Sequence, residues 1–556
     1  MVTKTHTRSI KDDTTSTYKS LTDAVLDTEL RISTVVTTTS YRSEAECLGL
    51  SIDYPDGGGG DYIVVPSGTG VADGGSFIDA GSKQIKLIVN NNELALASFG
   101  LIKTLEVDQA ARMQAVLAYA KSSGIGRILV DGGYYFTNTL TETDITVSFI
   151  GSSNMEDYFV FEGCDGFNID NNTGSIRAPF VFHNVGVYSK DVNLYTGIYF
   201  KGNLNNPYNQ QFQFNLSKTA GLEAGAWKTG IELDSASQST LTMSTLQGDS
   251  VNSLTDTCLK CVDSNNVIVD SCDFTYFDEA IVVEGSGGFV ISHNHIIGGI
   301  TGIIKQGNEN YIAVHDNHFA VSKSAVIIPD EVSNSSNHNH ISDNFVLMYD
   351  DIATVTEDFI AFDISSNYNK IHDNEILRTV GSRNRYGVVL RGLGSRQASD
   401  NQILENNFNA MTKGVVIEAG VINTDVLDNH RVGVSRANLL EDNGTNTAFR
   451  GIDSTSAFTT AATHEFLTPD GTAMEIEKVA TGVASGAWLS MVSHQAGGVP
   501  RVEAKGVDTD INLELKPKGA GLVQFGTTVA VGAETITHYI TIRDASGTAT
   551  KLAVLS

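Results

Sequence analysis

Short segments in which apolar and polar residues alternate recur along residues 269–430. Seven of them share one order: an apolar residue and a spacer, then polar residues that usually include Asn, and often a second apolar residue. They span 269–274, 291–296, 314–319, 341–345, 371–376, 403–408 and 426–430. Alternation with a period of two in segments rich in Ile and Val predicts β-strands.

These segments return at a regular step. The matching position is held by Cys272, Asn294, Asn317, Asn344, Asn374, Asn406 and Asn429. The steps between these residues are 22, 23, 27, 30, 32 and 23. Self-similarity at such a period is typical of a stacked repeat.

A second set of apolar segments precedes the later copies. They span 280–283, 302–304, 325–328, 359–362, 387–390 and 414–417. Gly, Asn, Ser and Asp between the strands leave no room for crossover helices. Equivalent strands of successive repeats must therefore pair in parallel, roughly 4.8 Å apart, around a continuous core. A β-sandwich also has many short strands, but it does not explain why Asn returns at matched positions. Asn suits a corner, because it tolerates left-handed backbone geometry and its amide can bond to neighbours above and below.

The ends of the chain have a different pattern. A short helix is predicted from Ser20 to about Leu30, followed by strands at 32–38 and 62–65. Residues 56–60 form a Gly-rich run with no Lys at phosphate-loop spacing, which favours a turn. An amphipathic helix at 106–121 ends at Gly124, and its apolar face comprises Ala110, Met113, Val116, Leu117 and Ala120. After 432 the repeat stops; we expect a linker at 433–460 and then strands at 488–492, 511–515, 522–525 and 539–542.

Charge and cysteines exclude several classes of protein. The net charge of -28 argues against nucleic acid and against an anionic membrane surface. The five Cys residues form no disulfide framework, and Cys258 with Cys261 fits a buried strand better than a metal site. The N-terminal residues contain no apolar signal region and no segment is long enough to span a bilayer, so we expect neither a signal peptide nor membrane insertion.

Stacked strands can assemble a site without a local motif. Alignment of Cys258 with Ala280 places Asp256 beneath Asp278, with Glu279 adjacent. Like charges this close raise one pKa and supply a general acid, and paired carboxylates suit glycoside hydrolysis by a retaining or an inverting route. Trp227 and Tyr276 are expected to contact a sugar ring. The alternative is a set of ordinary acids on a solvated turn.

The longest repeats indicate a binding face. Extra residues fall at 348–358, 378–386 and 395–397, and insertions in a solenoid usually lie on one face. Tyr349, Arg378, Arg383 and Arg385 are candidate substrate contacts there, the arginines for an anionic glycan. Alternatively, these loops pair with each other or across a trimer.

Seven histidines also follow the repeat: 293, 295, 315, 318, 338, 340 and 372. A solvent-facing ladder explains them better than a metal site, since no compact third ligand is implied. We therefore expect no metal and no cofactor. His318 or His372 as the base of a lyase stays an alternative.

Residues 56–65 and 68–79 resemble the head segment of bacteriophage tailspikes. The helix at 106–121 resembles the capping helix of pectate-lyase-like tailspikes, although 99–108 lacks the Asp-rich turn common there. Residues 510–525 and 539–548 resemble C-terminal parts of phage fibres and spikes. The resemblance implies an all-β chain with a right-handed parallel β-helix. Its parts are a head at 1–95, a cap and first coil at 96–140, coils at 141–432, a linker at 433–460 and a trimerisation domain at 461–556.

The same resemblance implies a function. A tailspike is part of the virion tail, is attached to the tail or baseplate through its N-terminus, and acts at the host cell surface as a homotrimer. It binds and cleaves a capsule, exopolysaccharide or O-antigen. We expect an endo-glycosidase with Asp278 or Glu279 as acid and Asp256 as its partner. The alternatives are a polysaccharide lyase and a non-catalytic receptor-binding spike or adhesin.

Overall fold

A computed structural model shows two units, residues 1–478 and 479–556. It describes residues 9–12, 15–172, 178–203, 211–248, 254–285, 287–307, 311–329, 338–348, 355–377, 383–392, 398–434, 439–445 and 447–450, followed by seven strands between 459 and 555. No helix among these residues is long and apolar enough to cross a bilayer.

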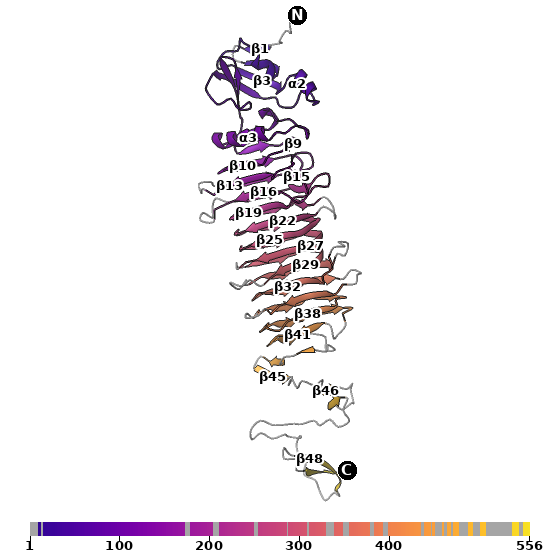
Figure 1. Cartoon of the computed structure of the whole chain (residues 1–556). Coiled ribbons are helices and arrows are strands. Elements are labelled where there is room, and N and C mark those ends of the chain that lie inside the picture. The colour runs from indigo at the N-terminus through magenta and orange to yellow at the C-terminus, as the bar shows by residue number, and fades with distance from the viewer. Residues whose placement is uncertain are drawn as a thin grey trace. The chain divides into compact units, whose positions relative to one another are not determined.

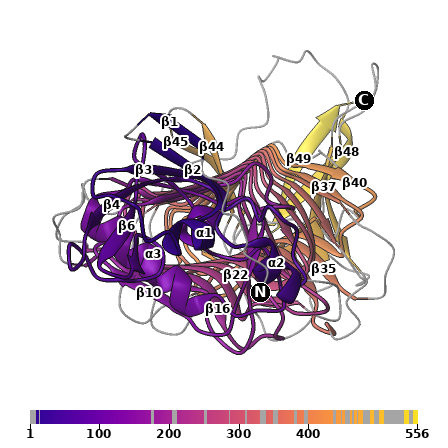
Figure 2. The same ribbon diagram turned by 90° about the horizontal axis from the view of Figure 1, so that it is seen from above.

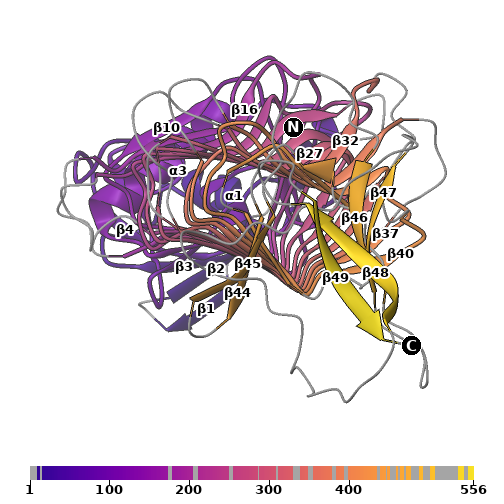
Figure 3. The same ribbon diagram turned by 90° about the horizontal axis from the view of Figure 1, so that it is seen from below.

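Successive coils of a right-handed parallel β-helix stack along one axis in the first unit (Figure 1). Views along this axis show the coils superposed (Figure 2; Figure 3). Each coil contributes strands to three faces, and every strand pairs in parallel with its equivalents in the adjacent coils. The predicted fold class is confirmed.

Face 1 is a 14-stranded sheet. Its strands are β7 (Glu93–Ala95), β8 (Arg127–Leu129), β11 (Ser148–Ile150), β14 (Phe180–His183), β17 (Phe212–Asn215), β20 (Thr240–Thr242), β23 (Ile268–Asp270), β26 (Phe289–Ser292), β28 (Ile312–His315), β30 (His340–Ser342), β33 (Lys370–His372), β36 (Gln402–Leu404), β39 (Asp425–Leu427) and β42 (Ala448–Arg450).

Faces 2 and 3 are joined because two long strands, β27 (His295–Gln306) and β29 (His318–Ile328), run through both. The other strands of face 2 are β9 (Gly133–Phe136), β12 (Tyr158–Phe161), β15 (Gly186–Ser189), β18 (Lys218–Gly221), β21 (Thr245–Gln247), β24 (Asp273–Thr275), β31 (Phe345–Met348), β34 (Glu375–Leu377), β37 (Asn407–Asn409) and β40 (His430–Val432). Those of face 3 are β10 (Leu140–Thr143), β13 (Phe167–Asp170), β16 (Thr196–Lys201), β19 (Thr229–Asp234), β22 (Thr255–Val262), β25 (Phe277–Glu284), β32 (Phe359–Ile364), β35 (Arg385–Leu390), β38 (Lys413–Ile417), β41 (Leu440–Asp442) and β43 (Thr459–Thr460).

The recurring Asn residues form a buried ladder at the corner between faces 1 and 2. From Asn294 to Asn429, each side-chain amide donates to the Oδ1 of the next Asn at 2.9–3.0 Å. Each Oδ1 also accepts the backbone N–H of the preceding rung, as between Asn344 and Asn374 at 3.0 Å. The left-handed backbone falls on the residue before the Asn, such as Asp343 with φ 57° and Asp373 with φ 54°, and not on the Asn itself. Because the coils are in register, the side-chain amide of each Asn in the ladder finds hydrogen-bond partners in the neighbouring coils.

The core changes character along the axis. Phe side chains fill the early coils, where Phe149 and Phe182 stack at 5.2 Å between ring centroids. Ile and Val fill the later coils, including Ile303, Val326 and Ile364, each 0–1% exposed. Cys258 and Cys261 are also buried and unpaired, as a core position requires. Each coil therefore buries its apolar side chains against its two neighbours.

The first coil is capped by α3 (Ala110–Ser123). Its buried residues are Ala110, Met113, Val116, Leu117 and Ala120, the predicted apolar face, and Gly124 ends it with φ 67°. The amide of Gln114 donates to the carbonyl of Thr141 in β10 at 2.5 Å and accepts its N–H at 3.1 Å. This side chain supplies the hydrogen bonds that a preceding strand would make, so the sheet edge is not left open.

The head forms a mixed six-stranded sheet in the order β1-β2-β3-β4-β6-β5. Its elements are β1 (Ser9–Asp12), β2 (Thr15–Ser20), α1 (Leu21–Val25), β3 (Val35–Ser40), α2 (Glu44–Gly49), β4 (Asp61–Pro66), β5 (Phe77–Ala80) and β6 (Lys83–Leu87), followed by a short 3₁₀ turn, η1 (Ala97–Phe99). The helix α2 was not predicted, although Ser43 and Glu46 form a capping box at its start. The Gly-rich run is a turn, since the Asp56 carboxylate accepts the N–H of Gly58 at 2.9 Å.

The coils continue past residue 432. β41 pairs with β38, and β42 pairs with β39, within the range 433–460 that the sequence predicts as a linker. The ladder Asn is missing there, but Leu439 and Leu440 remain buried in the core. Beyond them lie three antiparallel hairpins: β44 (His464–Thr468) with β45 (Gly471–Ile476), β46 (Ala487–Val492) with β47 (Arg501–Gly506), and β48 (Ile536–Arg543) with β49 (Ala549–Leu555). The strands predicted at 511–515 and 522–525 lie outside the described residues.

Candidate functional site

Two acidic residues of adjacent coils lie side by side on face 3. Thr255 pairs with Phe277 and Thr257 with Glu279, which puts Asp256 of β22 opposite Asp278 of β25. Both acids are partly exposed to solvent. The register predicted from Cys258 and Ala280 is therefore confirmed, and strands that pair in this way are about 4.8 Å apart.

The surroundings of the two carboxyl groups differ. Burial raises the pKa of Asp278, and the nearby carboxylates of Asp256 and Glu279 raise it further. Burial also raises the pKa of Asp256, but the ammonium group of Lys228 opposes this shift. Burial favours the protonated form of both groups, and the neighbouring charges add to this effect at Asp278 and partly offset it at Asp256.

Glu279 has a partner that Asp278 does not share. Burial raises the pKa of Glu279, but the hydroxyl of Thr257 donates a hydrogen bond to its Oε2 at 3.2 Å and favours the charged form. The carboxylates of Glu284 and Asp256 act in the opposite direction. Both predicted acids therefore have a raised pKa, and at Glu279 the hydrogen bond from Thr257 and the charge of Lys260 oppose the shift.

Tyr276 lies next to this pair and is partly exposed, with φ 57°. Its ring is close to Gly298 on the neighbouring coil, where an added Cβ would meet it at 3.8 Å. Phe277 beside it points into the core. Tyr276 is therefore the predicted aromatic residue that remains accessible beside the acids.

Trp227 is not available to a ligand. Its side chain is 0% exposed, its indole N–H donates to the carbonyl of Val187 at 3.3 Å, and its ring lies 6.2 Å from that of Phe161. The prediction of Trp227 as a sugar-binding residue is wrong, because its coil turns the indole into the core instead of toward face 3.

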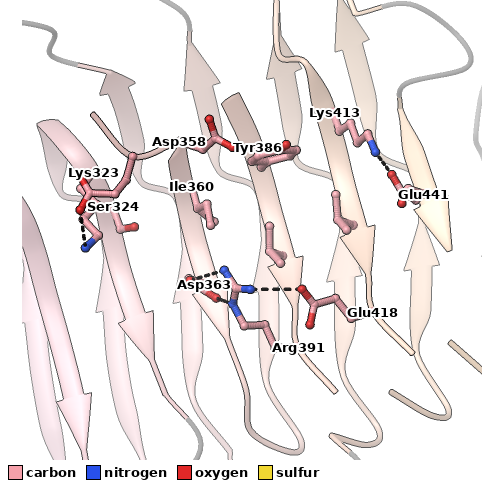
Figure 4. A pocket seen from close by; sticks show the side chains of 13 residues that line it. Lys323, Ser324, Asp358, Ile360, Asp363, Tyr386, Arg391, Lys413, Glu418 and Glu441 are labelled. Carbon is pink, nitrogen blue, oxygen red and sulfur yellow. Dashed lines mark hydrogen bonds and ion pairs between the residues drawn. The ribbon is translucent and has the colours of Figure 1, made fainter. Parts of the chain in front are cut away.

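A groove of about 470 Å³ lies on face 3, farther along the axis (Figure 4). It is lined by Lys323, Ser324, Glu357, Asp358, Ile360, Asp363, Tyr386, Val389, Arg391, Lys413, Val416, Glu418 and Glu441. These residues belong to β29, β32, β35, β38 and β41 or directly adjoin them. The groove lies among the coils with the longest steps, and Glu357, Asp358 and Tyr386 come from the segments in which the sequence places extra residues.

The described cationic residues of the groove are each paired with a carboxylate of the groove (Figure 4). Arg391 donates through Nε and Nη2 to the two carboxylate oxygens of Asp363 at 2.5 and 2.9 Å, and through Nη1 to Glu418 at 3.1 Å. Lys413 forms an ion pair with Glu441. Ile360, Val389 and Val416 provide the apolar part of the lining.

The predicted arginine contacts are placed differently. Arg385 is only 4% exposed, and its Nε lies 3.0 Å from the sulfur of Met348. The prediction that Arg385 contacts substrate is wrong, because the guanidinium is enclosed beneath the face. Arg383 is partly exposed and donates through Nη1 to the carbonyl of Glu357 at 3.0 Å. Tyr349 and Arg378 lie outside the described residues.

The central groove residues were missed, although the sequence contains their signal. The strand Gly-Val-Val-Leu (387–390) aligns with Gly-Val-Val-Ile (414–417), so Arg391 and Glu418 follow at matching positions. The structure pairs Leu390 with Ile417 as this alignment requires. The same register comparison that found Asp256 and Asp278 would also have found this pair.

Four of the histidines pair with carboxylates on both sides of the corner ladder. His293 lies 2.9 Å from Asp270, His295 3.1 Å from Asp273, His315 2.9 Å from Asp316 and His372 2.6 Å from Asp373. His340 contacts His372 through Nε2. In the described part of the chain, no group of three or more His, Cys, Asp or Glu is placed to hold a metal ion.

Comparison with known proteins adds structures of similar fold. No family model matches the sequence, and no curated protein matches it. A tailspike of an Acinetobacter phage is 13% identical, with a TM-score of 0.46 over 86% of this chain and 79% of that one. The Dettilon tailspike is 12% identical, with a TM-score of 0.45 over 72% and 74% of the two chains. A mannuronan C-5 epimerase module of Azotobacter vinelandii is 13% identical, with a TM-score of 0.41 over 68% and 98%.

Proposed function

We propose that the protein is a phage tailspike that binds a bacterial surface polysaccharide and hydrolyses its internal glycosidic bonds. The observation that carries this proposal is the register of Asp256 and Asp278 on the solvent side of face 3. Two carboxyl groups on one open face suit glycoside hydrolysis when their surroundings differ, and here Lys228 opposes the rise in pKa at Asp256 whereas Glu279 adds to it at Asp278. The resemblance of the head and C-terminal segments to phage tail proteins supports the biological setting: a homotrimer attached to the virion through its N-terminus.

The spacing of the two residues favours a retaining reaction. Neighbouring strands are about 4.8 Å apart, and retaining glycosidases have carboxyl groups about 5–5.5 Å apart, whereas inverting enzymes need about 6.5–9.5 Å. The spacing of adjacent strands is therefore close to the carboxyl separation of retaining enzymes and shorter than that of inverting ones.

The chemistry then assigns one role to each residue. Asp278 gives its proton to the glycosidic oxygen as that bond breaks, while the Asp256 carboxylate attacks the anomeric carbon and forms a glycosyl ester. Asp278, now ionised, takes a proton from a water molecule that attacks the same carbon. Asp256 leaves as a carboxylate, and Asp278 is protonated again. Lys228 favours the ionised form of Asp256 that the first step needs, and Glu279 helps to keep Asp278 protonated.

A screen of purified capsules, exopolysaccharides and O-antigens tests the proposal. We expect release of reducing ends from one of them, with rapid loss of viscosity because cleavage is internal. The first product, followed by proton NMR, should keep the anomeric configuration of the substrate. Inversion contradicts the roles given to Asp256 and Asp278.

Two other outcomes identify the alternatives. An absorbing unsaturated uronic product indicates a lyase, for which His318 is a candidate because burial lowers the pKa of its imidazole, with a further contribution from His295. Tight binding to a glycan that is never cleaved indicates a receptor-binding spike.

A further inference from the structure

We infer that the groove between β29 and β41 accepts an uncharged stretch of glycan and rejects acidic sugars. This inference rests on the proposed function, and it assigns a substrate class to residues that the sequence did not single out. Its basis is the arrangement of charge in the described lining, where Arg391, Lys413 and Lys323 each have a carboxylate of the same chain beside them.

Arg391 is the residue best suited to bind an acidic sugar, but its guanidinium is occupied. A guanidinium recognises a carboxylate through two parallel N–H groups, and Asp363 already accepts such a pair from Nε and Nη2. Glu418 accepts from Nη1 on the other side. A sugar carboxylate would have to displace an internal one, with no net gain in hydrogen bonds.

The two lysines are compensated as well. Lys413 forms an ion pair with Glu441, and Lys323 lies 4.0 Å from Glu357. The described residues of the lining include five carboxylates, Glu357, Asp358, Asp363, Glu418 and Glu441, against three cationic groups. They give the groove a local excess of two negative charges, within a chain whose net charge is -28. Both repel a polyanion.

The remaining surface fits a neutral sugar. Val389 and Val416 lie in register on β35 and β38, and Ile360 lies in register with Tyr386. These side chains offer apolar contact to the C–H face of a pyranose, while the paired carboxylates at the rim accept hydrogen bonds from its hydroxyl groups. An uncharged ring can be desolvated here at far lower free-energy cost than a sugar carboxylate without a free cation.

Binding by the full chain tests the inference. A panel of purified polysaccharides is divided into those with uncharged repeating units and those with uronic or sialic acid, and affinity is measured at low and high NaCl. We expect the tightest ligand to be uncharged, with a Kd that changes less than about twofold with salt, since no ion pair forms. An acidic glycan as the tightest ligand overturns the inference but leaves the proposed function standing. Binding to neither class overturns both.

A charge variant makes the test independent of the panel. In the double variant Asp363→Asn/Glu418→Gln, Arg391 loses both carboxylates, and we expect affinity for oligogalacturonate to rise about tenfold, equivalent to about 1.4 kcal/mol. The matched control is Asp343→Asn/Asp373→Asn, which removes two exposed carboxylates at left-handed corner positions that Asn also tolerates. If both variants bind oligogalacturonate equally, Asp363 and Glu418 do not prevent Arg391 from binding a sugar carboxylate, and the inference fails.

Discussion

Asp256 and Asp278 occupy equivalent positions in adjacent coils, and Lys228 opposes the rise in pKa at the first. Burial raises the pKa of both carboxyl groups, and at Asp278 the carboxylates of Asp256 and Glu279 raise it further. Parallel stacking brings the two residues together although 22 positions separate them. The consequences can be measured one residue at a time.

Replacement of the proton donor should separate cleavage from binding. Asp278→Asn keeps the shape of the side chain but cannot protonate the glycosidic oxygen, so we expect kcat to fall by about 10²–10⁴-fold. Affinity for the polysaccharide should change little. Asp273→Asn, which alters an exposed acid of the same coil on face 2, should leave both unchanged. A fully active Asp278→Asn enzyme rules out the assigned role.

The pH dependence should respond to Glu279. The alkaline limb of kcat reports loss of the proton from Asp278, and the negative charge of Glu279 raises the pKa of that group. Glu279→Gln is therefore expected to move the alkaline limb to lower pH. Glu284→Gln on the same strand should not, because Glu284 is paired with Lys260 at 3.2 Å and does not act on Asp278. A limb that stays in place, or moves upward, contradicts the coupling.

Removal of a carboxyl group should change the Tm at pH 7 in opposite directions at Asp278 and at Asp234. A carboxyl group whose pKa is raised in the folded state stabilises it below the unfolded pKa of about 3.9, and this contribution is lost as pH rises through the folded pKa. We expect Asp278→Asn to raise the Tm at pH 7 and to change it little at pH 3.5.

Asp234 is the contrasting case. Burial raises its pKa, but hydrogen bonds from Tyr199, Ser235 and Lys201 outweigh burial and lower it overall. Its ionised form stabilises the folded state above the unfolded pKa, and this contribution is lost as pH falls. Asp234→Asn should therefore lower the Tm at pH 7 and have little effect at low pH. Scanning fluorimetry at the two pH values decides both cases, and a shift of equal sign for the two variants refutes them.

The ladder predicts a large effect from a small change. Asn344→Ala removes the Oδ1 that accepts from the backbone N–H and the side-chain amide of Asn317. It also removes the amide that donates to the Oδ1 of Asn374 and to the carbonyl of Val314. Each buried polar group left without a partner costs about 1–3 kcal/mol. We expect the urea midpoint to fall accordingly, while Asn172→Ala at an exposed turn should change the free energy of unfolding by less than about 0.5 kcal/mol. Equal midpoints for the two variants would show that the ladder is not a stabilising feature.

The sequence was sufficient where the repeat is regular. The 22-residue step from Cys258 to Ala280 determined which strand lies beside which, and hence placed Asp256 opposite Asp278. The sequence was insufficient where the direction of a side chain, into the core or toward solvent, depends on the local path of a single coil. Trp and Arg are common at binding surfaces, but the side chains of Trp227 and Arg385 point inward. The residue type alone does not reveal this orientation. The pairing of Asp363 with Arg391 is diagonal between β32 and β35, so a comparison of matched positions does not reach it.

Faces 2 and 3 meet directly in the coil that carries Asp278 and in the two coils that follow it. β24 and β25 have only Tyr276 between them, and β27 and β29 pass from one face to the other without interruption. A polymer can lie sideways across this corner, so no free end has to be found or threaded, and a long chain can be engaged at any point along its length.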